Sequence, residues 1–349
     1  MTRAKSMTAL VFLAVIALLL PVESSAQGRP QNGRIAYISG SLEGPTDVAS
    51  ITASGTVTKL TRSEPNELYV DVSSDGRLVA FTRFGKNGGD IYTVPIRGGN
   101  VARLTSDRVH DELPIWSPDS DRIAFVRYPN GADSEIFIMD ADGSNRSRIT
   151  DNNVSDADPR WSPDGTQLIY NSGEIDTNGQ DVLLVSLGEP GAVNLTTEGV
   201  NDSFAEWSPD GNSIAYSSFR NEQWDVFVVA TDGTGTARLT DDPVDDYAPE
   251  WSPDGSKLLY VHGRLEGNLP ADRVIVMNPD GSEKLSLSPP RLNAFSPDWS
   301  PDGAKIVFIG QVNPEAPNWE IFKIGSGGTD LKRLTRTDAM EFDPEWARR

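Results

Sequence analysis

Short apolar runs of four or five residues recur along almost the whole chain, and segments that contain glycine, proline, asparagine or aspartate separate them. The runs are rich in isoleucine, valine, leucine and aromatic residues, and they lack the 3.6-residue period of an amphipathic helix. This pattern is typical of β-strands joined by tight turns. One recurring set predicts strands at residues 78–82, 123–126, 168–171, 214–217, 258–261 and 306–309.

These runs are parts of one repeat. The sequence Trp-Ser-Pro-Asp-Gly begins at Trp161, Trp207, Trp251 and Trp299, near copies begin at Val72 and Trp116, and a further copy starts at Trp346. After each turn comes a strand, a variable loop, a second strand, a glycine turn, and a third strand that ends in Leu-Thr or a similar pair. The pairs are Leu60-Thr61, Leu104-Thr105, Ile149-Thr150, Leu195-Thr196, Leu239-Thr240, Leu285-Ser286 and Leu334-Thr335. A fourth strand then runs into the next tryptophan.

Four short strands in each of seven units predict an all-β fold, a seven-bladed β-propeller with four antiparallel strands per blade. The first unit lacks its first strand, and residues 341–346 form a first strand with no blade after it. We therefore expect the C-terminal strand to complete the N-terminal blade and so remove an open sheet edge. Residues 27–349 then form a single propeller domain.

Residues 1–26 predict a signal peptide. Arg3 and Lys5 precede an apolar run over residues 7–20, which Pro21 ends, and small residues follow at 24–26. The run is short for a membrane-spanning helix, so we expect cleavage and export to the periplasm or the medium, with an uncleaved anchor as the alternative. After cleavage we expect no membrane insertion.

Composition narrows the function classes. The chain has 349 residues, 51 acidic, 31 basic, two histidines and no cysteine. Disulfides, thiolate metal sites and cysteine nucleophiles are therefore excluded. A net charge of −20 argues against nucleic acid as a partner. Gly-x-Ser-x-Gly and phosphate-binding glycine motifs are absent, so we do not expect an enzyme, although carboxylate pairs leave glycoside chemistry open.

The repeat Pro-x-Trp-Ser-Pro-Asp-Gly, followed by Ile-Ala-Tyr, Asp-Ile-Tyr and Arg-Leu-Thr, resembles that of the TolB-like, WD40-like propellers over roughly residues 33–346. The resemblance implies an envelope protein whose first candidate partner is a peptidoglycan-associated lipoprotein. TolB itself carries a further α/β domain before a six-bladed propeller. Only residues 27–32 precede the first strand here, so we expect a TolB-like protein rather than TolB. Related seven-bladed propellers are pectic-oligosaccharide lyases with a histidine-rich manganese site, which His110 and His262 alone do not supply.

The repeated Trp-Ser-Pro-Asp-Gly predicts structure rather than chemistry. The tryptophan can bury apolar surface between blades, while aspartate and glycine suit the turn.

Acidic residues recur at a second fixed place. Five residues before the tryptophan position stand Glu67, Asp111, Asp156, Asp202, Asp246, Ala294 and Glu341, and directly before it stand Asp71, Ile115, Arg160, Glu206, Glu250, Asp298 and Glu345. In a ring of blades we expect the first set to converge near the mouth of the central channel, where like charges raise each other's pKa or recruit a counter-ion. The resulting acidic funnel would attract a cation or a basic segment of a partner. The alternative is that these carboxylates only serve the turns that begin each strand.

The variable loops lie on one face of the expected disk, which we call the loop face; the Ser-Pro-Asp-Gly turns lie on the opposite turn face. Binding usually resides in such loops. Candidate contact residues there are His110, Tyr247, Phe295, Arg291, Phe342, Trp224 and Trp319. They are interface anchors or merely cover blade edges, and the sequence leaves both open.

These observations favour an exported, monomeric, non-catalytic binding propeller without a resident cofactor, which holds an envelope protein or peptide. The first alternative is a carbohydrate-binding or carbohydrate-active propeller, with loop aromatics stacked on sugars. The second is a structural propeller with a divalent cation in the central channel.

Overall fold

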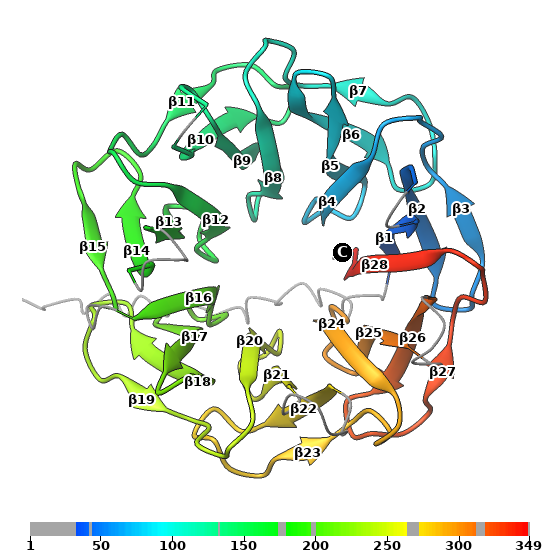
Figure 1. Ribbon diagram of the computed structural model, residues 1–349, viewed down its shortest axis with the longest axis vertical. Helices are drawn as coiled ribbons and strands as arrows, with labels where there is room; N and C mark the ends of the chain where they lie inside the picture. The colour runs from blue at the N-terminus through cyan, green and yellow to red at the C-terminus, as the bar shows by residue number, and fades with distance from the viewer. Residues whose placement is uncertain are drawn as a thin grey trace, which may run out of the picture.

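The computed structural model describes residues 33–41, 44–131, 133–173, 179–196, 200–263, 272–311 and 318–347. The described residues form seven four-stranded antiparallel sheets arranged as blades around a central channel (Figure 1). The expected signal peptide lies outside the described residues. Within the described ranges, no helix is long and apolar enough to cross a membrane.

The blades are numbered along the chain, and each is given from its innermost to its outermost strand. Blade 1 consists of β28 (Met340–Trp346), β1 (Arg34–Gly40), β2 (Thr46–Thr52) and β3 (Val57–Lys59). Blade 2 consists of β4 (Glu67–Val72), β5 (Leu78–Gly85), β6 (Gly88–Pro95) and β7 (Ala102–Arg103). Blade 3 consists of β8 (Asp111–Trp116), β9 (Arg122–Arg127), β10 (Glu135–Asp140) and β11 (Ser147–Arg148).

The remaining four blades repeat this order. Blade 4 consists of β12 (Asp156–Trp161), β13 (Gln167–Ser172), β14 (Asp181–Ser186) and β15 (Ala192–Asn194). Blade 5 consists of β16 (Asn201–Trp207), β17 (Ser213–Arg220), β18 (Gln223–Ala230) and β19 (Ala237–Arg238). Blade 6 consists of β20 (Asp246–Trp251), β21 (Leu258–His262), β22 (Arg273–Met277) and β23 (Leu285–Ser286). Blade 7 consists of β24 (Asn293–Trp299), β25 (Lys305–Gln311), β26 (Trp319–Gly325) and β27 (Lys332–Arg333).

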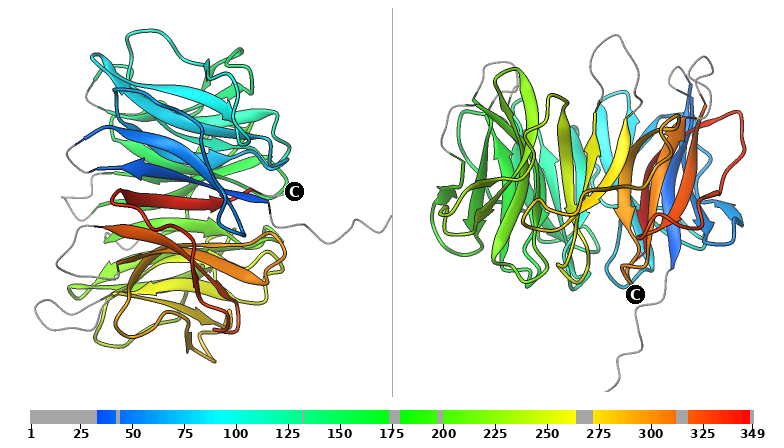
Figure 2. Two further views of the ribbon diagram at one scale, coloured as in Figure 1. Left: turned by 90° about the vertical axis from the view of Figure 1, so that its right-hand side faces the viewer. Right: turned by 90° about the horizontal axis from the view of Figure 1, so that it is seen from below.

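The ring closes as the repeat predicts. Strand β28, the last of the chain, pairs with β1, the first, so the two ends share blade 1 (Figures 1 and 2). The register runs from Ile35 opposite Trp346 to Gly40 opposite Met340. All six predicted strand segments lie within observed strands, which extend one to three residues beyond them at one or both ends.

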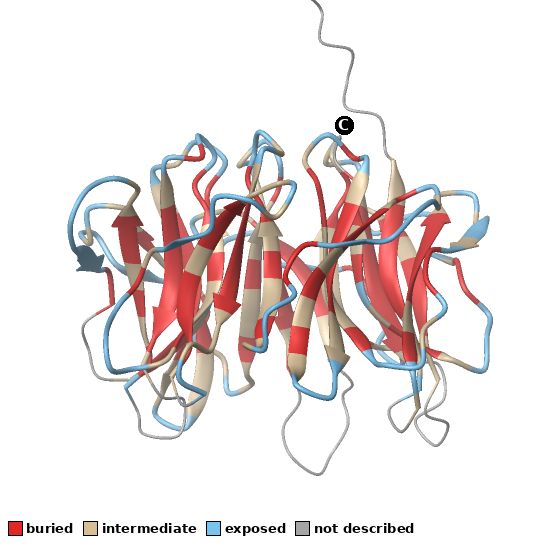
Figure 3. Ribbon diagram, turned by 90° about the horizontal axis from the view of Figure 1, so that it is seen from above, coloured by how far each residue is buried: buried red, intermediate tan, exposed pale blue. Residues whose placement is uncertain are grey.

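The core lies between neighbouring blades. One buried cluster joins Ile35 and Tyr37 of blade 1 to Val307 and Ile309 of blade 7, and Trp346 lies among them. Buried residues form continuous runs in the second strand of each blade and fill the middle of the disk, while many connecting loops are exposed (Figure 3). Burial of the repeated tryptophans confirms their structural role, since five of the six in this register are at most 7% exposed and Trp251 is half-buried.

The Ser-Pro-Asp-Gly turns are built by their own side chains. In blade 4, Ser162 Oγ donates to Asp164 Oδ1 at 2.6 Å, and Gly165 N donates to the carbonyl of Ser162 at 2.9 Å. Gly165 has a φ of 70°, which glycine adopts without the strain that a side chain adds. The equivalent serine–aspartate bond occurs in blades 2, 3, 5, 6 and 7. Part of the acidic surplus therefore serves turn geometry.

One part of the predicted repeat is wrong by two residues. In six blades the Leu-Thr or Ile-Thr pair directly follows the outermost strand. Its apolar residue covers the blade, and the threonine hydroxyl accepts a backbone N–H from the third strand counted from the channel. In blade 6 this role falls to Leu287 and Ser288, and Ser288 Oγ accepts from Val274 N at 3.1 Å. Leu285 and Ser286, the predicted pair, form the outer strand β23 itself, and Leu285 is exposed. Two similar Leu-Ser pairs in succession made the sequence register ambiguous.

Candidate functional site

The six acidic residues expected at the channel mouth lie inside the blades. Glu67, Asp111, Asp156, Asp202, Asp246 and Glu341 are each 0% exposed. Each stands at or next to the start of its innermost strand and opposite a residue of the neighbouring strand of the same blade. Their expected placement as an open acidic funnel is therefore wrong, because a partner has no access to these carboxylates in the folded ring.

What these carboxylates do can be read from the residues opposite them. The cross-strand pairs are Glu67 with Arg83, Asp111 with Arg127, Asp156 with Ser172, Asp202 with Ser218, Asp246 with His262, and Glu341 with Ser39. In blade 7 the pair is Ala294 with Gly310, and neither residue is charged. A buried carboxylate needs hydrogen bonds or a cation. Some blades place a hydroxyl opposite the carboxylate, and others place a basic side chain there.

In two blades with a hydroxyl opposite, the residue four positions earlier donates to the carboxylate: Asn152 Nδ2 bonds Asp156 at 2.7 Å, and Thr337 Oγ1 bonds Glu341 at 2.8 Å. Where Arg127 lies opposite, the residue is Asp107, whose Oδ2 is 2.5 Å from the guanidinium. The first set of carboxylates therefore fastens the beginning of each inner strand to its own blade.

Burial also changes how these carboxyls titrate. Burial raises the pKa of Glu341 to about 7 and that of Asp202 to about 6. Desolvation rather than repulsion between neighbouring charges is the main cause, because the six residues sit in separate blades.

This titration predicts an unusual pH dependence. A carboxyl with a raised pKa holds its proton better in the folded than in the unfolded protein, so its contribution to stability is lost as pH rises from the unfolded value through the folded one. We expect the free energy of unfolding to fall between pH 4.5 and 7.5, by roughly 2 kcal/mol through Glu341 alone. Thermal unfolding at intervals of half a pH unit measures this fall. Glu341→Gln should flatten the profile, and an unchanged slope in that variant would contradict the assignment.

The residues directly before the tryptophans, by contrast, connect neighbouring blades around the channel. Glu250 Oε1 accepts from the backbone N–H of Trp299 at 3.1 Å, and Glu345 Oε2 accepts from Val72 N at 3.2 Å. The same carboxylate-to-backbone bond joins Asp71 to Trp116 and Asp298 to Trp346. Each bond links one innermost strand to the next, so these carboxylates support the ring as well as lining its interior.

A third set of residues also recurs at one place in every inner strand. Each inner strand has a bulge two residues after its first-set position, where a non-glycine residue takes a positive φ: Tyr69, Leu113, Asp158, Phe204, Ala248, Ser296 and Asp343. Burial and the charges of Glu112, Asp343 and Asp158, which belong to three other blades, raise the pKa of Tyr69. Side chains from blades 1 to 4 therefore face one space.

Acidic residues other than the six expected lie on the innermost strands around the channel. Asp158 and Asp343 lie on the bulges, and the pre-tryptophan ring adds Asp71, Glu206, Glu250, Asp298 and Glu345. Desolvation and the neighbouring Asp298 raise the pKa of Glu250 well above its ordinary range. The cation in the same ring is Arg160, 3.7 Å from Glu206.

The predicted loop-face aromatics gather into three clusters, each across a junction of two blades. The blade 2–3 cluster contains Tyr69, Phe84, His110 and Tyr128, with successive ring centroids 4.8–6.3 Å apart. The blade 5–6 cluster contains Phe204, Phe219, Trp224 and Tyr247, at 5.3–6.5 Å. The blade 7–1 cluster contains Phe295, Trp319 and Phe342, at 4.9 and 5.2 Å. All three lie at the ends of the inner strands away from the C-terminus, which is on the turn face (Figure 3).

The blade 5–6 cluster is the most open of the three. Phe204 is 50% exposed, and it is held on a bulge with a φ of 54°. Trp224 and Tyr247 on either side are half-buried. Both are among the contact residues expected from the sequence, whereas Phe204 is not. Its position two residues after a first-set acid was the available signal, but the bulge that turns it outward has no sequence signature. Arg291, also predicted, is exposed before β24.

Comparison with known proteins identifies the family of the chain. The family model described as the TolB beta propeller domain, PD40, matches residues 31–288, so the chain belongs to this family. The uncharacterized protein Atu1656 of Agrobacterium fabrum is 32% identical over 94 residues, which are 25% of this chain and 32% of that protein. This chain therefore matches about a third of the length of that relative.

Solved structures share the fold at low identity. TolB from Acinetobacter baumannii is 17% identical, with a TM-score of 0.59 over 90% of this chain and 82% of that one. An oligogalacturonate lyase in complex with manganese is 16% identical, with a TM-score of 0.63 over 88% and 86%. A puromycin hydrolase is 17% identical, with a TM-score of 0.70 over 89% of this chain and 54% of that chain. Binding proteins and enzymes thus share this scaffold, and function has to be argued from the site.

Proposed function

We propose that this chain is an exported, non-catalytic binding propeller of the bacterial envelope that holds a protein or peptide on its loop face. The observation that carries the proposal is the blade 5–6 aromatic cluster, in which a half-exposed phenylalanine stands between a tryptophan and a tyrosine at the channel mouth. Aromatic side chains of this kind dominate binding energy at protein interfaces.

The charge of the channel favours one chemistry of partner. Asp158 and Asp343 lie at the bulges nearest the mouth, and the pre-tryptophan carboxylates lie below them. A segment that carries lysine or arginine beside apolar residues would match both the aromatic rim and the acidic interior. By resemblance to TolB, a peptidoglycan-associated lipoprotein in the periplasm is the first candidate.

The same charge argues against the chemistry of the lyase that shares the fold. An anionic oligosaccharide would meet carboxylates around the channel, and like charges repel. The two histidines of the chain lie in different blades and have different partners. His110 Nε2 lies 3.1 Å from Glu112 in blade 3, while His262 pairs with Asp246 in blade 6. A hydrolase of the kind that shares the fold would need a nucleophile motif, and Gly-x-Ser-x-Gly is absent from the sequence.

Capture of a partner from envelope extract tests the proposal. The parent protein is compared with Phe204→Ala, and captured proteins are identified and then rebound in purified form. We expect Phe204→Ala to weaken binding of the purified partner at least tenfold, because loss of an interface anchor costs about 2 kcal/mol or more. Asp158→Asn with Asp343→Asn should reduce the dependence of binding on salt concentration.

The matched control is Val193→Ala. The exposed fraction of Val193, 51%, is close to that of Phe204, but Val193 lies on the outer strand β15 of blade 4. It should bind like the parent. Equal binding by the parent and the Phe204 variant, or equal loss in both variants, would rule out the loop face as the site.

A neutral carbohydrate is the second candidate, because Trp224 and Tyr247 also offer ring faces on which a sugar can stack. A glycan array separates the two functions. Glycan binding that Phe204→Ala abolishes would replace the peptide proposal.

A further inference from the structure

Two blades contain the same three-residue arrangement, with arginine in one and histidine in the other. In blade 3, Arg127 lies opposite Asp111, and Asp107 precedes Asp111 by four residues. In blade 6, His262 lies opposite Asp246, and Asp242 precedes Asp246 by four residues. The fold thus places a nitrogen-bearing side chain between two carboxylates at equivalent positions, so blade 3 is an internal reference for blade 6.

In blade 3 the guanidinium satisfies both carboxylates. Arg127 Nη1 lies 3.0 Å from each oxygen of Asp111, and Nη2 lies 2.5 Å from Asp107 Oδ2. The forked group bonds both partners at once, as arginine does with carboxylates elsewhere.

In blade 6 the imidazole reaches only one of them. His262 Nδ1 lies 2.8 Å from Asp246 Oδ1 but 3.9 Å from Asp242 Oδ1. Two buried oxygens, Asp246 Oδ2 and Asp242 Oδ1, accept no hydrogen bond from the described residues. Asp246 is 0% exposed, so its second oxygen has no ready access to solvent. Unsatisfied buried carboxylate oxygens are costly and point to a missing cation.

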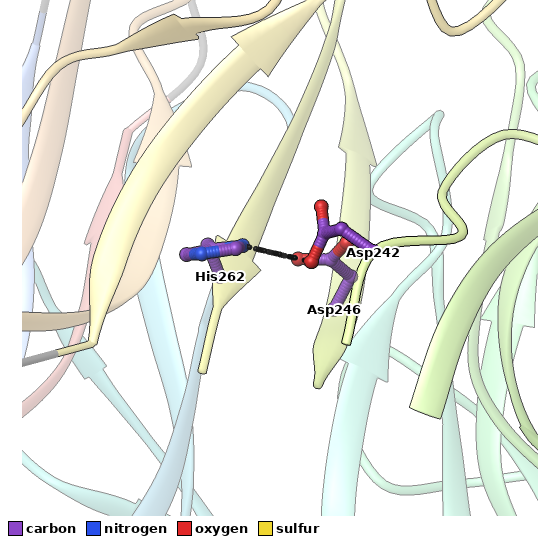
Figure 4. A group of neighbouring side chains, drawn as sticks. All are labelled: Asp242, Asp246 and His262. Carbon is purple, nitrogen blue, oxygen red and sulfur yellow. Dashed lines mark hydrogen bonds and ion pairs between the residues drawn. The ribbon is translucent and has the colours of Figure 1, made fainter. Parts of the chain in front are cut away.

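The three side chains converge from separate segments (Figure 4). Asp246 opens β20, His262 ends β21, and Asp242 lies between β19 and β20. One ligand atom of each lies within 4.8 Å of the others. A divalent transition metal with ligands at about 2.0–2.2 Å spaces those ligands about 3–4 Å apart, so modest side-chain rotation brings all three into range. Lys284 Nζ is 3.9 Å from Asp242 Oδ2, and so leaves Asp242 Oδ1 for the metal.

We propose that Asp242, Asp246 and His262 form a binding site for one divalent transition-metal ion, with water completing its coordination. One imidazole and two carboxylates suit Zn²⁺ or Mn²⁺, whereas Ca²⁺ prefers ligands that are all oxygen. The site lies within blade 6, outside the central channel, and it fastens the chain before β20 to the end of β21. It does not depend on the proposed function, since metal binding is measured without a partner.

The site adjoins the blade 5–6 aromatic cluster. Asp245 Oδ1 accepts from Trp224 N at 3.0 Å, and the Asp245 carbonyl accepts from Gly263 N at 2.5 Å. Asp245 lies directly before Asp246, and Tyr247 lies directly after it. A metal at Asp246 therefore also stiffens the backbone that carries Trp224 and Tyr247.

Calorimetric titration of the metal-stripped full chain with ZnCl₂, and separately with MnCl₂, tests the site. We expect one ion of at least one of these metals per chain, with a Kd in the micromolar range or below, and a rise in melting temperature of several degrees at saturation. His262→Arg copies Arg127 of blade 3 and supplies a permanent cation, so it should abolish metal binding while it keeps the melting temperature of the metal-free parent. Asp242→Asn should weaken binding at least tenfold.

His110→Ala is the control for the second histidine and should bind metal like the parent. The proposal is overturned if neither metal binds the parent at 100 μM. It is equally overturned if His262→Arg, folded by its melting transition, still binds one ion, or if His110→Ala is the variant that loses it.

Discussion

Replacing Trp346 with alanine is expected to lower the free energy of unfolding by about 3–5 kcal/mol, the range for a large aromatic side chain removed from a core. Trp346 is 1% exposed and packs among residues of blades 1 and 7. It also lies on β28, the strand that closes the ring. Its loss therefore creates a cavity where the two ends of the chain meet. Chemical denaturation followed by intrinsic fluorescence measures the change.

Trp251→Ala is the matched control. Trp251 occupies the same place in the repeat in blade 6, but it is half-buried. A smaller loss is expected there, because less apolar surface leaves contact with the protein. An equal loss of unfolding free energy in both variants would show that Trp346 of the ring-closing strand contributes no more to stability than Trp251.

The second large effect is expected at Arg127. Arg127→Ser leaves Asp111 buried without its cation, and breaking a buried pair from one side costs about 3–5 kcal/mol. The desolvated carboxyl should then take up a proton, so the loss should be smaller at pH 5 than at pH 8. Equilibrium unfolding at the two pH values measures both effects.

The chain itself suggests the compensating change. Blade 4 holds Asp156 with Asn152 and Ser172 in place of an aspartate and a cation. Adding Asp107→Asn to Arg127→Ser copies that arrangement into blade 3, and it should restore at least 1 kcal/mol, because the new amide can donate to Asp111 as Asn152 donates to Asp156. Additive losses in the double variant would show that the two blades do not share one design.

The propeller was predictable because its repeat is long and its punctuation is strong. A tryptophan followed by Ser-Pro-Asp-Gly fixes both a packing residue and a turn, and the missing first strand of blade 1 together with the extra strand after Thr335 predicted how the ring closes. Blade 6 was the exception, because its sequence allows two positions for the outermost strand. Leu285 and Leu287 alternate in sequence like any two strand residues, and only the backbone bond to Ser288 decides which of them covers the blade.

The site was less predictable, because it depends on which way each side chain points. Glu67 and Glu345 both recur at fixed places in the repeat, yet one is buried inside its blade and the other bonds the backbone of Val72 in the neighbouring blade. In each of these strands a bulge lies between the first-set position and the pre-tryptophan position, so it shifts the register and exchanges the faces of the strand. The same bulge exposes Phe204. Periodicity alone therefore found the acidic positions but not the face that they occupy.

The most direct test of loop-face binding is hydrogen–deuterium exchange of the protein with and without its purified partner. The account predicts new protection in residues 200–207, 219–224 and 245–249, which carry the blade 5–6 aromatic cluster, and little change in the turns at residues 162–166 and 208–212. Protection confined to those turns, or to the outer strands, would contradict it and place the binding surface elsewhere on the propeller.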